Sequence, residues 1–148
     1  MLKGLDPLLG PDLLAALRAM GHGDELAIVD ANFPATALAR RLCREDGVDA
    51  VRMLAAVGSV LSLDDFGAVA AWRMGAVDPA EEPPAIVGAF AQVLSAAGYD
   101  GAIGVLAREA FYQRAAEAFV VVATGEARLY GNLILRKGVI RPPRGVRA

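Results

Sequence analysis

The stretch Phe119-Val120-Val121-Val122-Ala123 is the clearest β-strand in the sequence, because it is an unbroken apolar run dominated by β-branched valine. The residues from Arg108 to Ala118 carry a helical pattern and lead directly into it. The turn residues Thr124-Gly125-Glu126 follow it, and the run Leu133-Ile134-Leu135 predicts a last strand. This part of the chain therefore predicts a helix followed by two strands.

The same alternation extends toward the N-terminus. Leu26 to Val29 is a continuous apolar run, as expected for a strand buried on both faces, and Pro11 and Gly21 suit the start and the left-handed stop of a preceding helix. Further strands are expected over Ala68 to Met74 and Ala102 to Leu106, and helices over Pro11 to Met20, Ala35 to Cys43, Val51 to Val60 and Ile86 to Gly98. This order predicts an α/β fold: three α/β/α layers with a mostly parallel central sheet flanked by helices.

Length and composition predict one domain over residues 1–148, in which residues 141–148 form a basic, flexible tail. The formal net charge of −2 argues against a nucleic-acid partner. No N-terminal targeting signal is visible, and no apolar stretch is long enough to span a membrane. We therefore expect a cytoplasmic protein with no membrane partner.

The single cysteine, Cys43, cannot form an internal disulfide, which favours a reducing compartment. It lies in a helical pattern and is expected to be a small core residue. No cysteine and histidine spacing predicts a metal site, and neither the G-x-G-x-x-G nor the G-x-S-x-G motif is present. The sequence therefore favours chemistry without a metal or a cofactor.

The only histidine, His22, follows the first helix and precedes the first strand. Histidine is the side-chain type whose ordinary pKa lies near neutral pH, so His22 is the best candidate for moving a proton. Its flanking Gly21 and Gly23 leave a second interpretation open, in which it is a helix-capping or surface residue.

Four further polar positions lie at the ends of apolar runs. Asp30 follows a predicted strand, where α/β folds place ligands, although it could also be an N-cap or Asx-turn residue. Arg108 opens a helix and could equally be a surface arginine. Tyr130-Gly131-Asn132 offers a phenol and an amide suited to polyols, or simply a turn. Together with His22, this set could bind a sugar and transfer protons, or bind a sugar without changing it.

Several blocks of sequence resemble the L-fucose mutarotases, which are grouped with the D-ribose pyranases. The blocks are Met1-Leu2-Lys3-Gly4, Met20-Gly21-His22-Gly23-Asp24-Glu25, Asp30-Ala31-Asn32-Phe33-Pro34-Ala35, Phe111-Tyr112-Gln113-Arg114-Ala115, Thr124-Gly125-Glu126 and Tyr130-Gly131-Asn132-Leu133-Ile134-Leu135-Arg136-Lys137-Gly138-Val139. They cover nearly the whole chain in order. The first and last blocks together are specific, whereas either alone is only suggestive.

The resemblance implies a cofactor-independent isomerase that interconverts the α and β anomers of L-fucose, and of related pyranoses. It assigns acid/base catalysis to His22, with Tyr130 as a second catalytic group. It assigns sugar binding to Asp30, Arg108, Tyr130, Gly131 and Asn132. Asn32 departs from the fucose-type pattern, in which some members carry histidine, so a single-histidine mechanism must recruit Tyr130, Asp30 or water.

Two alternatives remain open at this stage. A D-ribose pyranase would share most of the site, although that branch tends to carry histidine where this chain has Arg108. A non-catalytic sugar-binding or regulatory protein would keep the pocket without needing the titratable His22.

The positions of His22 and Asp30, before and after a predicted strand, imply that the two residues lie far apart within one chain. A strand between them keeps its ends about 15 Å apart at about 3.3 Å per residue. Either the glycine-flanked loop folds back, or different subunits complete one pocket. The resemblance implies a ring-shaped, decamer-like homo-oligomer with pockets between neighbours, which favours the second route.

Overall fold

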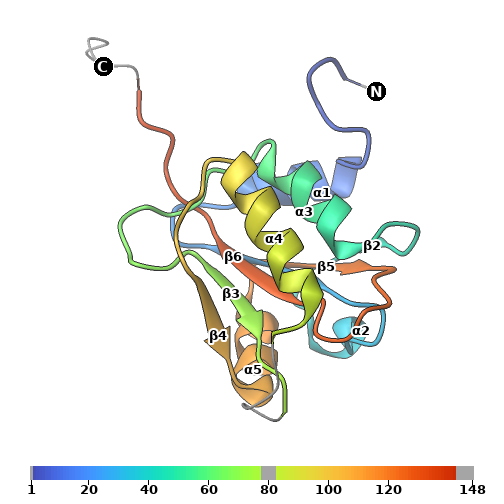
Figure 1. Cartoon of the computed structure of the whole chain (residues 1–148). Coiled ribbons are helices and arrows are strands. Elements are labelled where there is room, and N and C mark those ends of the chain that lie inside the picture. Colours follow the sequence, from blue (N-terminus) through green and yellow to red (C-terminus); the bar gives the residue numbers. More distant parts are fainter. Residues whose placement is uncertain (1, 78–82, 143–148) are drawn as a thin grey trace.

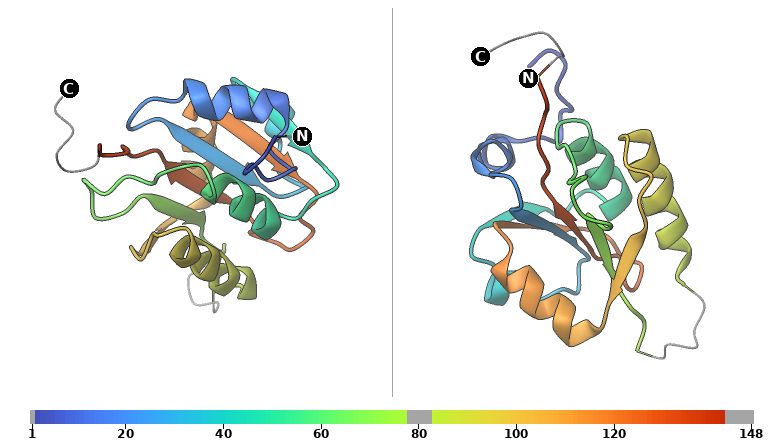
Figure 2. Two further views of the ribbon diagram at one scale, coloured as in Figure 1. Left: turned by 90° about the horizontal axis from the view of Figure 1, so that it is seen from above. Right: turned by 90° about the vertical axis from the view of Figure 1, so that its left-hand side faces the viewer.

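The computed structural model describes residues 2–77 and 83–142, and these form one six-stranded sheet with helices on both faces (Figures 1 and 2). The strands are β1 (Glu25–Val29), β2 (Leu42–Glu45), β3 (Ala71–Met74), β4 (Ile103–Leu106), β5 (Val120–Thr124) and β6 (Leu133–Arg136). The helices are α1 (Pro11–Ala19), α2 (Ala35–Leu38), α3 (Ala50–Gly58), α4 (Ala85–Ala96) and α5 (Arg108–Glu117). Residues 78–82 and, of the expected tail over 141–148, residues 143–148 lie outside the described residues.

The strand order is β2-β5-β1-β6-β3-β4, and within it only β6 runs against its neighbours. The predicted three-layer α/β/α fold with a mostly parallel sheet is therefore confirmed. The carboxyl ends of the five parallel strands meet at one edge of the sheet, together with the amino end of β6. We call this the carboxyl edge, and the opposite side of the sheet the amino edge.

The central strands β1, β5 and β6 are apolar except at one terminal residue each, because both of their faces are buried. Leu26 and Ile28 of β1 pack in the cluster that includes residues of α1, α3 and α4, while Ala27 and Val29 pack with residues of α2 and α5. Every residue of β5 is also buried. The right-hand view of Figure 2 shows the two helical layers on either side of the sheet.

Two local predictions were wrong. The helix expected over Ala35 to Cys43 ends at Leu38, because Ala39 adopts an extended backbone, and Cys43 lies in β2 opposite Val122 of β5. The hydrogen bonds that β5 offers a parallel edge strand outweigh the local helical spacing. Cys43 is nevertheless buried in the core, as expected. The first helix ends with extended backbone at Met20, and Gly23, not Gly21, has the left-handed conformation (φ 87°).

This topology separates the sequence-predicted site residues. His22 precedes β1 at the amino edge, whereas Asp30 follows β1 at the carboxyl edge. Arg108 follows β4, and Tyr130 to Asn132 precede the antiparallel β6, so these residues also reach the carboxyl edge. Across the described ranges, no helix has the length and apolar character needed to cross a membrane.

Candidate functional site

A pocket of about 200 Å³ lies at the carboxyl edge and brings together four of the predicted residues: Asp30, Arg108, Tyr130 and Asn132. Its apolar walls include the side chains of Phe33, Met74, Val77 and Leu129. A pocket that combines a few convergent polar groups with apolar walls is typical of a small-molecule site.

Asp30 and Asn132, which both line this pocket, are buried and are joined by two hydrogen bonds. The Asn132 Nδ2 donates to Asp30 Oδ2 at 2.6 Å, and the Asp30 backbone N–H donates to Asn132 Oδ1 at 2.9 Å. The Asn32 backbone N–H donates to Asp30 Oδ1 at 2.9 Å, which is the hydrogen bond of the Asx turn that the sequence offered as an alternative. Burial raises the pKa of Asp30, although the hydrogen bonds from Asn132 and Asn32 act in the opposite direction.

The segment before β6 is shaped by the backbone conformation of Tyr130 and by close packing at Gly131. Tyr130 has a left-handed backbone (φ 62°), which is rare for a bulky residue, and its hydroxyl accepts a hydrogen bond from the Val77 backbone N–H at 3.3 Å. A Cβ at Gly131 would lie 2.5 Å from Glu126 Cγ, so only glycine fits there. Gly131 therefore sets the path of the chain between Tyr130 and Asn132.

Arg108 and Tyr112 form the side of the pocket that belongs to α5. The guanidinium carbon of Arg108 lies 5.6 Å from the centre of the Tyr112 ring, and both residues line the pocket. Tyr112 belongs to one of the blocks that resemble the fucose mutarotases, but the resemblance assigned it no role. Its spacing of four residues from Arg108 on one helix places the two on the same face, and this spacing could have identified it.

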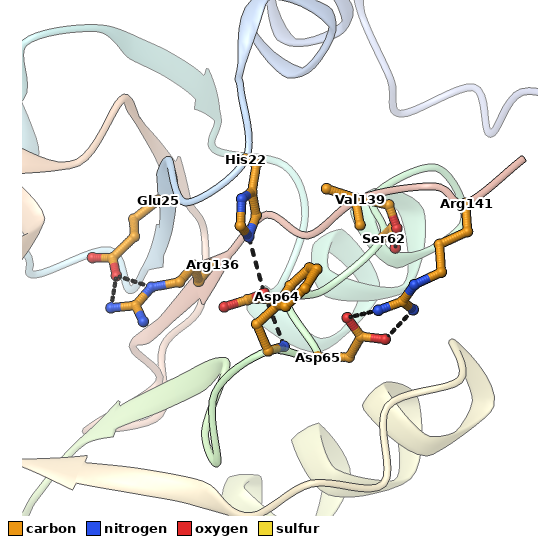
Figure 3. Close-up of polar contacts among 9 residues, drawn as sticks. His22, Glu25, Ser62, Asp64, Asp65, Arg136, Val139 and Arg141 are labelled. Atoms are coloured by element: carbon orange, nitrogen blue, oxygen red, sulfur yellow. Dashed lines mark hydrogen bonds and ion pairs between the residues drawn. The ribbon is translucent and has the colours of Figure 1, made fainter. Parts of the chain in front are cut away.

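His22 lies at the amino edge, at the opposite end of β1 from this pocket. Figure 3 shows its ring pointing toward Asp64. Its Nε2 lies 3.2 Å from Oδ1 of Asp64, and its ring centre is 5.2 Å from that of Phe66. The His22 side chain is 47% exposed and that of Asp64 only 7%, so the imidazole is accessible while its partner is fixed. A buried carboxylate that orients an accessible imidazole is a common arrangement for proton transfer.

Asp64 was missed by the sequence analysis because no local signal connects it with His22, which lies 42 positions earlier. The Phe66 backbone N–H donates to Asp64 Oδ1 at 3.2 Å, and this hydrogen bond, together with the contact from His22, lowers the pKa of Asp64. Asp64 therefore remains a carboxylate to well below neutral pH.

The molecule thus presents two groups of polar residues at opposite ends of β1. The pocket group offers a carboxylate, two amides, a guanidinium and two phenols, which suit a polyol. The His22 group offers an imidazole and its carboxylate partner. In residues 2–77 and 83–142, no cluster of three or more histidine, cysteine or acidic side chains is placed to hold a metal ion.

Comparison with known proteins adds independent information. Residues 3–140 match the model of the RbsD / FucU transport protein family. The chain is 44% identical to a fucose mutarotase of Bos taurus, over 96% of each chain, and 40% identical to an L-fucose mutarotase of Histophilus somni, over 94% of this chain and 97% of the relative. A solved structure of the fucose mutarotase of Streptococcus pneumoniae in complex with L-fucose superposes with a TM-score of 0.89 at 39% identity, over 95% of this chain and 100% of that one.

Proposed function

Because the chain belongs to the RbsD / FucU family, we infer that it is an isomerase that interconverts the α and β anomers of L-fucose. The observation that carries this is the pocket at the carboxyl edge, where Asp30, Arg108, Tyr130 and Asn132 converge. The similarity to fucose mutarotases covers more than nine-tenths of the chain and supports the same conclusion.

The chemistry requires two proton transfers. A base removes the proton of the anomeric hydroxyl, an acid protonates the ring oxygen, and the bond between C1 and the ring oxygen breaks to give the aldehyde. Rotation about C1–C2 and reclosure on the other face of the aldehyde, with both transfers reversed, give the other anomer. We assign one transfer to His22, oriented by Asp64, and the other to the Tyr130 phenol. Asp30, Arg108 and Asn132 hold the hydroxyls.

These assignments require the two residue groups to meet. Within one chain, β1 holds them apart by about 15 Å. We propose that the protein is a homo-oligomer, a ring in which His22 of one subunit faces the pocket of its neighbour. Both surfaces carry large exposed apolar side chains, Phe66 beside His22 (67% exposed) and Leu129 beside the pocket (68% exposed), of the kind that a subunit contact covers.

Saturation-transfer NMR on equilibrated L-fucose tests this function directly. The protein should accelerate α–β exchange, and His22→Ala should lower the catalysed rate by about 10²-fold or more, since positioned acid/base catalysis is worth 10²–10⁴-fold. Tyr130→Phe should lower it while preserving the fold. The exposed pair Arg44–Asp46, on and next to β2, lines neither group, so Arg44→Ala is a suitable control.

Each negative outcome of this experiment would indicate a different function. Acceleration of pyran–furan exchange in D-ribose, without any effect on L-fucose, would indicate the ribose pyranase. Binding of L-fucose without accelerated exchange would indicate a non-catalytic sugar-binding protein. We place this metabolism in the cytoplasm, because the lone Cys43 suits a reducing compartment.

A further inference from the structure

The segment from Arg136 to Arg141, which we call the C-terminal strap, runs alongside the loop from Ser62 to Phe66, which we call the Asp64 loop (Figure 3). Backbone hydrogen bonds join them: the Asp64 N–H donates to Arg136 O at 3.0 Å, and the Gly138 N–H donates to Ser62 O at 2.7 Å. Leu63 and Lys137 form an antiparallel bridge between these two bonds. The Asp64 loop is therefore held from Ser62 to Asp64 by the C-terminal strap.

Close packing and side chains reinforce this contact. A Cβ at Gly138 would lie 2.6 Å from the carbonyl carbon of Leu63 and 2.8 Å from Asp64 Cα, so the approach requires glycine. Beyond it, Arg141 forms a two-pronged ion pair with Asp65, in which Nη2 donates to Oδ1 at 2.9 Å. The Arg141 guanidinium carbon also lies 5.3 Å from the centre of the Phe66 ring, which is itself against His22.

We propose that the C-terminal strap positions the catalytic histidine, and that Arg141 and Asp65 are positioning residues that act through the Asp64 loop. The ion pair anchors the loop at Asp65, between the carboxylate that orients His22 and the phenyl ring that packs on it. This inference rests on the proposed function, because it concerns the same proton transfer. It gives a role to Arg141, the first residue of the expected flexible tail.

The exposure of the Arg141–Asp65 ion pair makes the proposal testable. The side chains of Arg141 and Asp65 are 60% and 52% exposed, and exposed ion pairs contribute little to stability. Loss of activity in an Arg141 variant that unfolds like the parent would therefore report positioning. The control pair Arg44–Asp46 has a similar exposure, at 53% and 61%, and similar two-pronged geometry.

The experiment compares Arg141→Ala, Asp65→Asn and Arg44→Ala by L-fucose exchange. We expect the first two to lower kcat by about 5-fold with KM changed less than 2-fold, since displaced catalytic groups lose rate. Arg44→Ala should match the parent. The charge-exchanged double variant Asp65→Arg with Arg141→Asp should recover at least half of the parent kcat. Equal kcat in Arg141→Ala and the parent, or equal losses in Arg141→Ala and Arg44→Ala, would overturn the proposal.

A second readout does not depend on activity. His22 is the only histidine, so its ring ¹H and ¹⁵N signals are unambiguous in a tag-free protein. In Arg141→Ala these signals should shift toward those of Asp64→Asn, whereas in Arg44→Ala they should stay in place. If the parent fails to accelerate L-fucose exchange, the proposed function is wrong, yet these shifts still decide whether the strap positions His22. Unchanged signals in Arg141→Ala would contradict it.

Discussion

At the scale of single residues, two buried aspartates respond to pH in opposite directions. Burial raises the pKa of Asp30, so its ionisation costs stability as the pH rises through that raised value. Hydrogen bonds from Phe66 and His22 lower the pKa of Asp64, so its ionised form stabilises the fold above the pKa of the unfolded chain. That contribution is lost as the pH falls through the lower pKa of the folded protein. Of these two aspartates, only Asp64 therefore contributes to acid sensitivity.

The Asp64→Asn variant tests the direction of this pH dependence of stability. The variant should be less stable than the parent at pH 7, and the difference should shrink as the pH falls below about 4, where the parent begins to lose the same interaction. Urea unfolding at a series of pH values measures it. A stability difference that stayed constant between pH 7 and pH 3 would show that the carboxylate charge is not what Asp64 contributes.

At the scale of elements, the glycines show where close packing dictates the sequence. In β4, Gly104 lies against the indole of Trp72 in β3, and a Cβ there would be 2.8 Å from Trp72 Nε1. The guanidinium carbon of Arg114 lies over the same indole, 3.6 Å from the ring centre. Gly88 in α4 is exposed, and a Cβ there would meet nothing within 4 Å. One glycine is required by its neighbours and the other is not.

The same substitution should therefore have opposite effects in the two elements. Gly104→Ala should destabilise the fold by about 1–3 kcal/mol through overpacking, and it should shift the emission of Trp72, the only tryptophan. Gly88→Ala should stabilise it by about 0.5–1 kcal/mol, because alanine favours a helix interior. Thermal unfolding followed by circular dichroism and fluorescence measures both. Gly104→Ala with parental stability would mean that Trp72 moves aside without cost.

At the scale of the whole molecule, the main consequence is that one chain places its histidine and its pocket at opposite edges of the sheet. A symmetric ring solves this separation, because every subunit can offer its His22 to one neighbour and its pocket to another. The exposed Phe66 and Leu129 on these two surfaces then become buried.

Co-expression of two inactive variants tests this arrangement. His22→Ala and Asp30→Asn should each be inactive alone, whereas mixed oligomers carrying both should regain about one quarter of the parental exchange rate, the share of pockets formed by two intact halves. Two different tags allow the mixed species to be purified before L-fucose exchange is measured. Mixed oligomers without activity would indicate that each pocket is completed within a single chain.

The sequence by itself determined most of the strands and the polar residues that follow two of them. Unbroken apolar runs such as Leu26 to Val29 are local signals of strands buried on both faces, and Asp30 follows that strand directly. Arg108 lies two residues after β4, which is only partly buried. The helix predicted through Cys43 failed because the edge position beside β5, a tertiary contact, decided the conformation of β2.

Only the tertiary structure decided which polar residues meet. The antiparallel insertion of β6 between β1 and β3 brings Asn132 to Asp30 across 102 positions of sequence, and the strap fixes Asp64 beside His22 across 42. These contacts arise from strand pairing and close packing between distant segments. Local spacing of apolar and polar residues carries no information about that pairing. The sequence could therefore name Asp30, Asn132 and His22, but it could neither pair Asp30 with Asn132 nor identify Asp64 as the partner of His22.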